Sequence, residues 1–141
     1  MAIEIGRIPA NDNQPAVGIG IGIPFSANPV SGSDSIFKIN YTTADQIKSN
    51  IINYLLTSKG ERIFSPNFGS NIKEYLFEPL SDQTIETLKK DIEDSIKSIF
   101  PNVILKNIEA TPNFEFNVLT IQIFYSVFTS TDEFIELNIP L

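Results

Sequence analysis

Two glutamates in the middle of the chain are the residues whose chemistry is most informative. Glu61 and Glu78 are the candidates for acid–base catalysis, because cleavage of a glycosidic bond requires two carboxylates that face each other across it. Predicted turns separate them, and nothing in their spacing shows that they face one cleft. The simpler interpretation is that Glu61 pairs with a nearby cation or caps a helix end, and that Glu78 is a helix-terminal acid. No catalytic residue is therefore predicted.

Arg62, beside Glu61, is one of only two arginines in the chain. A guanidinium among glycine, proline and aromatic residues can hold a carboxylate or several carbonyls through its fork of donors. We expect an internal ion pair with Glu61 or Glu78 that fixes the loop, and the alternative is a contact with a partner protein. At least two of the three phenylalanines of this stretch are expected in the core; they are Phe64, Phe68 and Phe77.

The composition excludes several classes of site. The chain has no cysteine and no histidine, so disulfides, thiolate sites and Ser-His-Asp or Cys-His catalysis are ruled out, and no cofactor or metal site is predicted. The net charge of −7 argues against binding to nucleic acid, which needs clustered lysine and arginine. No apolar run is long enough to span a membrane and no signal peptide is recognisable, so we expect a soluble intracellular protein.

The chain is predicted to begin with an extended arm, residues 1–35, followed by a single domain, residues 36–141. The arm is rich in Gly, Pro, Asn and Ser, and residues 17–23 alternate apolar residues with glycine at the period of a strand. Such an arm is either poorly ordered or ordered against a neighbouring subunit. Glycine at every second position lets another surface approach the backbone closely.

Three helices are predicted in the domain from their caps and apolar periodicity. In the first, Thr43 and Gln46 form a capping box, and in the third, Ser81 or Asp82 is the cap. The apolar side chains of the third helix recur every three or four residues, as on a helix that packs on a core. The predicted spans are residues 43–59, 70–77 and 82–99, ended by Gly60, Pro79 and Pro101.

The C-terminal part of the chain predicts a sheet. Strands are expected at Val103–Glu109, Val118–Phe128 and Phe134–Ile139, with turns at residues 111–113 and 130–132. The predicted fold class is therefore α+β, with two or three helices packed on a small antiparallel C-terminal sheet and an extended N-terminal arm. Three strands leave two edges, so an edge is either covered by the N-terminal strand or offered to a partner protein.

The stretch from Gly60 to Pro79 reads G-E-R-x-x-x-P-x-F-G followed by x-x-I-x-x-x-L-F-E-P. In this motif the chain resembles the baseplate wedge, or sheath-initiator, proteins of contractile phage tails. That family has historically been called lysozyme-like and is related to TssE of type VI secretion. The resemblance extends from about Phe37 to the C-terminus. The matching positions are Gly60, Glu61, Arg62, Pro66, Phe68, Gly69, Leu76, Phe77, Glu78 and Pro79.

The resemblance implies a structural virion protein of the tail baseplate that assembles in the host cytoplasm, and not an enzyme. The implied partners are the sheath protein, larger wedge subunits, and hub or tube proteins, with no nucleic acid and no membrane. The motif residues would contact the wedge, and the C-terminal sheet would accept extended sheath strands by strand addition. The acceptor surface would include Leu119, Ile121, Ile123, Tyr125, Ile135, Leu137 and Ile139.

One position departs from the family pattern. Many members carry Glu-Pro-Arg at the end of the long helix, where this chain reads Phe100-Pro101-Asn102. Pro101 stays a candidate for the wedge contact, but a contact here must be apolar or mediated by the backbone. A peptidoglycan-cleaving enzyme that uses Glu61 and Glu78, and a component of a type VI secretion baseplate, remain the alternative functions.

Overall fold

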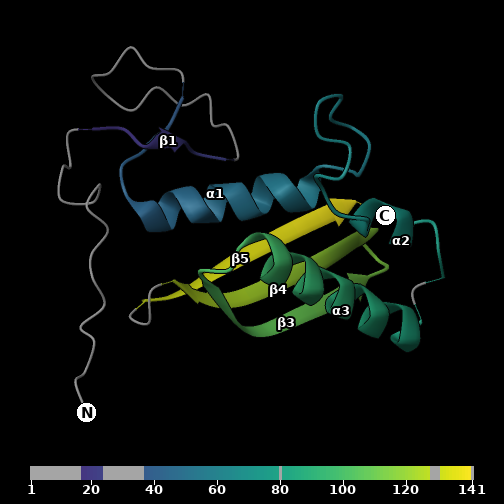
Figure 1. Cartoon of the computed structure of the whole chain (residues 1–141). Coiled ribbons are helices and arrows are strands. Elements are labelled where there is room, and N and C mark those ends of the chain that lie inside the picture. Colours follow the sequence, from purple (N-terminus) through teal and green to yellow (C-terminus); the bar gives the residue numbers. More distant parts are fainter. Residues whose placement is uncertain (1–16, 24–36, 80, 128–130, 141) are drawn as a thin grey trace. The chain divides into compact units, whose positions relative to one another are not determined.

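A computed structural model describes residues 17–23, 37–79, 81–127 and 131–140 of the 141-residue chain (Figure 1). The chain divides into two compact units, residues 1–53 and 54–141. Helix α1 (Thr43–Leu56) runs across this boundary. No helix within the described ranges combines the length and the apolar content needed to cross a membrane.

In the N-terminal unit, the glycine-alternating segment pairs with the same chain. Strand β1 (Gly20–Ile21) lies antiparallel to β2 (Ile39–Asn40), and the backbone N–H of Ile19 donates to the carbonyl of Asn40 at 2.8 Å. A Cβ atom on Gly20 would lie 2.0 Å from the Gln46 side chain. The lack of a side chain at Gly20 therefore lets β1 approach the first turn of α1 closely. Residues 1–16 and 24–35 of the predicted arm lie outside the described ranges.

The start of α1 is capped one residue earlier than predicted. The Thr42 hydroxyl accepts a hydrogen bond from the backbone N–H of Asp45 at 3.2 Å and donates to its carboxylate at 2.7 Å. The prediction that Thr43 and Gln46 form the capping box is therefore wrong. Gln46 instead accepts a hydrogen bond from the buried amide of Asn40 at 3.1 Å, because the β1–β2 pair brings Asn40 onto this turn of the helix.

The third predicted helix is confirmed by α3 (Asp82–Ile99), whereas α2 is shorter than predicted and covers Ile72–Tyr75. The Ser81 side chain caps α3 by accepting a hydrogen bond from the backbone N–H of Thr84 at 3.2 Å. The apolar stripe of α3 faces the interior; its buried residues are Leu88, Ile92 and Ile96.

The C-terminal sheet is an antiparallel meander of β3 (Val103–Asn113), β4 (Val118–Val127) and β5 (Thr131–Pro140), in the order β3-β4-β5. Helix α3 lies against this sheet alongside β3 (Figure 1). The predicted α+β fold class is confirmed. The inner face of the sheet carries a buried apolar layer: Leu119, Ile121, Ile123, Tyr125, Ile135, Leu137 and Ile139.

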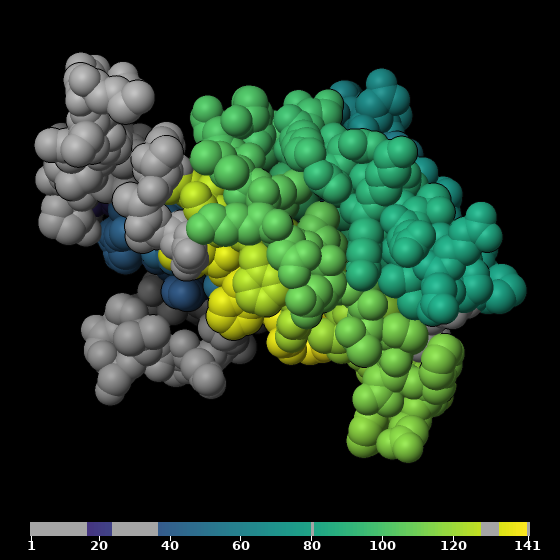
Figure 2. All heavy atoms as spheres, turned by 90° about the horizontal axis from the view of Figure 1, so that it is seen from below, coloured from purple at the N-terminus to yellow at the C-terminus, as the bar shows by residue number. Residues whose placement is uncertain are grey.

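The turn predicted at residues 111–113 is wrong, because these residues belong to β3. The turn lies at residues 114–117 and stands out from the rest of the unit (light green in Figure 2). Asn113 closes it by accepting hydrogen bonds from two backbone N–H groups within the turn, at 3.2 and 3.3 Å, and Asn117 has a positive φ of 51°. β3 is therefore longer than Thr-Pro-Asn suggests, and Phe114 and Phe116 are exposed at the tip.

Both edges of the meander are open within the described ranges. β3 and β5 each pair only with β4, and β1 pairs with β2 in a separate two-stranded sheet. Within the described ranges, the strand that could have covered an edge of the C-terminal sheet pairs instead with β2.

The stretch between α1 and α2 folds back on itself. The backbone N–H of Ser70 donates to the carbonyl of Thr57 at 2.9 Å, and the Ser70 hydroxyl donates to the carbonyl of Leu55 at 2.6 Å. Gly69 has a φ of +117°, and a Cβ on it would lie 2.5 Å from the Thr57 carbonyl oxygen. Gly60 also has a positive φ, of +84°, but a Cβ there would meet open space.

This difference gives a matched pair of substitutions. Gly60→Ala should lower the free energy of unfolding by about 1 kcal/mol, the cost of a left-handed alanine. Gly69→Ala should lower the free energy of unfolding by a further ~1–3 kcal/mol, because its methyl group would also collide with the backbone of Thr57 and Ser58. Urea denaturation of both variants measures the difference, and equal losses would contradict the role given to the Gly69–Thr57 contact.

Candidate functional site

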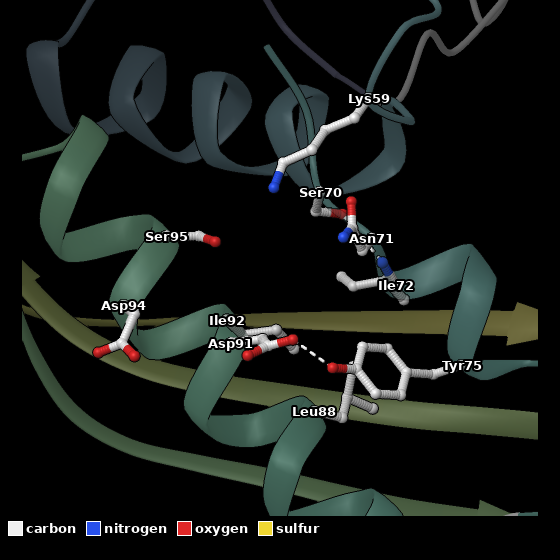
Figure 3. Close-up of a pocket in the computed structure, with 10 residues that line it drawn as sticks. All are labelled: Lys59, Ser70, Asn71, Ile72, Tyr75, Leu88, Asp91, Ile92, Asp94 and Ser95. Atoms are coloured by element: carbon white, nitrogen blue, oxygen red, sulfur yellow. Dashed lines mark hydrogen bonds between the residues drawn. The ribbon is translucent and has the colours of Figure 1, made fainter. Parts of the chain in front are cut away.

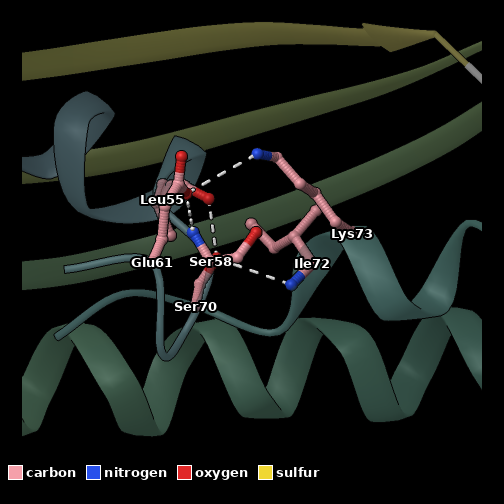
Figure 4. A network of polar contacts seen from close by, with 6 residues as sticks. All are labelled: Leu55, Ser58, Glu61, Ser70, Ile72 and Lys73. Carbon is pink, nitrogen blue, oxygen red and sulfur yellow. Dashed lines mark hydrogen bonds and ion pairs between the residues drawn. The ribbon is translucent and has the colours of Figure 1, made fainter. Parts of the chain in front are cut away.

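Glu61 stabilises the loop that follows α1. Its carboxylate accepts a hydrogen bond from the backbone N–H of Ser58 at 2.9 Å and lies 4.0 Å from the Lys73 ammonium (Figure 4). Both side chains of the ion pair are more than half exposed, so the pair itself adds little stability. The interpretation of Glu61 as an ion-pairing acid is confirmed.

Arg62 stacks on an aromatic ring. Its guanidinium carbon lies 4.0 Å from the centroid of Phe68, and Phe68 packs edge-on against Tyr54 at 5.2 Å. The ion pairs of the described residues do not include Arg62, so the prediction of an ion pair with Glu61 or Glu78 is wrong. The carboxylate of Glu61 is directed to Ser58 and Lys73, which leaves the flat guanidinium to cover the half-buried ring.

The phenylalanines of the motif stretch are mostly outside the core. Phe64 is fully exposed and Phe77 is 90% exposed, while Phe68 alone is half-buried. The prediction that at least two of them are buried is wrong, because the loop turns through Ser58, Gly60 and Pro66 and directs the intervening side chains outward. Ile63, which sequence reasoning did not single out, is 89% exposed. Ile63 follows the charged pair Glu61-Arg62 and precedes the Ser65-Pro66 turn, and it belongs to no helical or strand periodicity. This position in the sequence could have indicated that its side chain is exposed.

The remaining motif positions lie near the surface. Pro66, Glu78 and Pro79 are exposed and Leu76 is half-buried. Pro101 is exposed as well, in the turn that joins α3 to β3, next to Phe100, which packs edge-on against Tyr54.

The seven predicted strand-acceptor residues lie in the core. They are 0–8% exposed, and four of them belong to β4, the central strand. Their side chains therefore hold the sheet together, and the groups that can meet an added strand are the backbone N–H and C=O groups of β3 or β5.

A cavity of about 180 Å³ lies between α2, α3 and the preceding loop (Figure 3). Lys59, Asn71, Tyr75, Asp91 and Asp94 are among the residues that line it, and neither Glu61 nor Glu78 does. Within the described ranges, no group of three or more acidic side chains is placed to hold a metal ion. The structure therefore does not bring the two candidate catalytic glutamates together in this cavity.

In this cavity the Tyr75 hydroxyl donates a hydrogen bond to the Asp91 carboxylate (Figure 3). This hydrogen bond, partial burial and the negative charge of Asp91 raise the pKa of Tyr75 from 10.0 to about 12. Because the folded-state pKa is raised, the stability contributed by the pair is complete below about pH 10 and is lost as the pH rises towards 12.

Asp91→Asn should therefore lower the pKa of Tyr75 towards 10.0, since it removes the charged acceptor. Asp94→Asn is the control, because Asp94 lines the same cavity and is not among the groups that shift Tyr75. NMR titration of the tyrosine rings above pH 9 resolves Tyr75 from the other three tyrosines. A Tyr75 pKa that stays near 12 in Asp91→Asn would rule out the hydrogen bond as its cause.

Comparison with solved structures shows the same fold in three proteins. A protein of Geobacter sulfurreducens described as a tail lysozyme superposes with a TM-score of 0.67 and 24% identity, covering 74% of this chain and 96% of its own. A component of the anti-feeding prophage baseplate superposes with a TM-score of 0.54 and 18% identity, covering 84% of this chain and 81% of its own. A component of the type VI secretion baseplate complex superposes with a TM-score of 0.50 and 14% identity, covering 67% of this chain and 89% of its own.

Sequence comparison is more specific. Baseplate wedge protein gp25 of Enterobacteria phage T4 is 26% identical over 95 residues, which are 67% of this chain and 72% of that protein. The family model of baseplate wedge protein gp25 matches residues 42–132, which include the whole motif stretch and most of the C-terminal meander. The chain therefore belongs to the family of baseplate wedge protein gp25.

Proposed function

We propose that the chain is a structural subunit of a contractile-tail baseplate and that it initiates the sheath by accepting an extended strand of the sheath protein on its C-terminal sheet. The observation that carries this proposal is the pair of open edges on the β3-β4-β5 meander within the described ranges. An open edge presents a row of backbone donors and acceptors that an extended segment of another chain can satisfy.

The core supports this role because it makes the edges rigid. β4 is flanked on both sides, and its inward side chains Leu119, Ile121 and Ile123 are completely buried. An added strand thus meets a preformed surface. Binding therefore costs little free energy for ordering the acceptor edge.

We propose that the motif stretch contacts the larger wedge subunits. Ile63, Phe64 and Phe77 are almost completely exposed there, an unusual position for large apolar side chains of a protein that acts alone. Buried aromatic side chains contribute strongly at the centres of protein interfaces. Pro101 is exposed and offers a further apolar contact without the charges of the usual Glu-Pro-Arg.

In this proposal the protein resides in the tail baseplate of a virion, where hub or tube proteins are neighbours, and assembles in the host cytoplasm. The relative from phage T4 supports a phage tail, whereas the likeness to the type VI secretion baseplate shows the fold alone. The role of Glu61 in holding the loop supports a scaffold over a peptidoglycan-cleaving enzyme.

Sheath initiation is tested by electron microscopy of the sheath protein from the same tail, assembled with and without the chain. We expect the chain to increase the number of rings or short sheaths and to lie at one end of each, because an occupied edge supplies the first strand pairing. Equal numbers of assemblies in both samples would refute sheath initiation.

The wedge contact is tested by Phe64→Ser. Because Phe64 makes no core contact, this change should leave the free energy of unfolding unchanged and weaken binding to the larger wedge subunits by about tenfold or more. The matched control is Phe116→Ser at the exposed β3–β4 turn, which should leave wedge binding intact. Binding by calorimetry distinguishes the two variants, and equal affinities would place the wedge contact elsewhere.

A further inference from the structure

The two open edges of the C-terminal sheet differ in their backbone. On β3, the register with β4 shifts between Leu105 and Asn107, which places Lys106 at an irregularity, and Pro112 lacks an N–H group. On β5, the register with β4 is continuous over all ten pairs, and the proline is the last residue of the strand.

These differences decide which edge is suited to strand addition. A bulge, a lysine and a proline are the devices by which natural sheets block pairing at an edge. β3 carries all three, while β5 has no lysine and no irregularity in its register. β5 is therefore the edge along which a partner strand can extend the ladder without interruption.

The outer face of the sheet shows what the partner strand must carry. Glu109, Gln122 and Glu136 form one row across β3, β4 and β5. The Glu136 carboxylate accepts hydrogen bonds from the amides of Gln122 at 3.0 Å and Asn138 at 3.2 Å. Both donors are neutral, and the ion pairs of the described residues do not include Glu136, so its negative charge is not offset at the β5 edge.

The neighbouring row is aromatic. Phe124 on β4 and Phe134 on β5 are register partners whose rings stack with centroids 6.2 Å apart, and Phe134 remains about half exposed. On the opposite face, the inward residues of β5 are Ile135, Leu137 and Ile139. An added strand therefore finds an acidic and an aromatic position on one face of β5 and an apolar series on the other.

We propose, building on the proposed strand addition, that β5 is the acceptor edge and that the incoming strand places a lysine or arginine beside Glu136 and an aromatic or β-branched residue beside Phe134. Side chains on one face of a strand recur every two residues, so these two partner residues are separated by a single position. The residues of the incoming strand that lie on the opposite face are apolar and continue the buried series of β5. Cross-strand pairs of opposite charge and of aromatic with β-branched residues are the pairs that stabilise a sheet.

The first test compares Glu136→Lys with Glu109→Lys. These variants make the same charge change at two exposed positions of one row, on opposite edges of the sheet. Glu136→Lys should weaken binding of the sheath protein by about fivefold or more at low salt, since it converts an attraction into a repulsion. Glu109→Lys should bind as the unchanged chain does. A loss confined to Glu109→Lys, or no loss in either variant, would overturn the proposal.

The second test separates this proposal from sheath initiation. It uses two ten-residue peptides with blocked termini, in which valine and threonine alternate. One central threonine is replaced by lysine in the first peptide and by glutamate in the second. The unchanged chain should bind the lysine peptide more tightly, and Glu136→Lys should reverse the preference. NMR shifts of the backbone amides should map the peptide to β5.

If the sheath protein does not bind but the lysine peptide binds at β5 with this preference, the proposed partner is wrong and the edge chemistry stands. If neither peptide is preferred, or if the shifts map to β3, the assignment of β5 as the acceptor edge is overturned.

Discussion

The C-terminal unit depends on burying one face of an alternating sheet. Because successive side chains of a strand point to opposite faces, a register slip of one residue would expose Leu119, Ile121 and Ile123, which are completely buried. The constraint fixes the register of the strands, and because consecutive strands pair through short turns, β4 lies in the centre with β3 and β5 at the edges. The same constraint that builds the core thus creates two rows of backbone groups at the surface. The bulge on β3 and the continuous register of β5 make those rows unequal.

The motif stretch combines two kinds of residue. Gly69, Ser70 and Glu61 hold the backbone, through a close approach to Thr57, a hydrogen bond to Leu55 and a hydrogen bond from Ser58. Other positions of the same stretch present apolar groups to solvent. A loop that is fixed by its own backbone contacts can expose large apolar side chains without losing its shape. This is the property expected of a surface that is completed by a partner.

Local chemistry was sufficient to predict much of the fold. Ser81 and the apolar period of α3 specify a capped helix with one buried face, and both features act over a few residues. Alternation in β4 and β5 specifies strands and their buried face for the same reason. The motif from Gly60 to Pro79 indicated the family, and the family model matches the chain over residues 42–132.

Other features were decided by contacts between distant residues, which the sequence pattern does not contain. Arg62 stacks on Phe68 because Glu61 is engaged by Ser58 and Lys73. Residues 111–113 have turn chemistry, yet they continue β3 because pairing with β4 outweighs local propensity. By itself, the sequence determined the family and the presence of three helices and three C-terminal strands, but not where α2 and β3 end. Only the tertiary structure decided which phenylalanines are exposed and which edges are open, since both depend on where the chain folds back on itself.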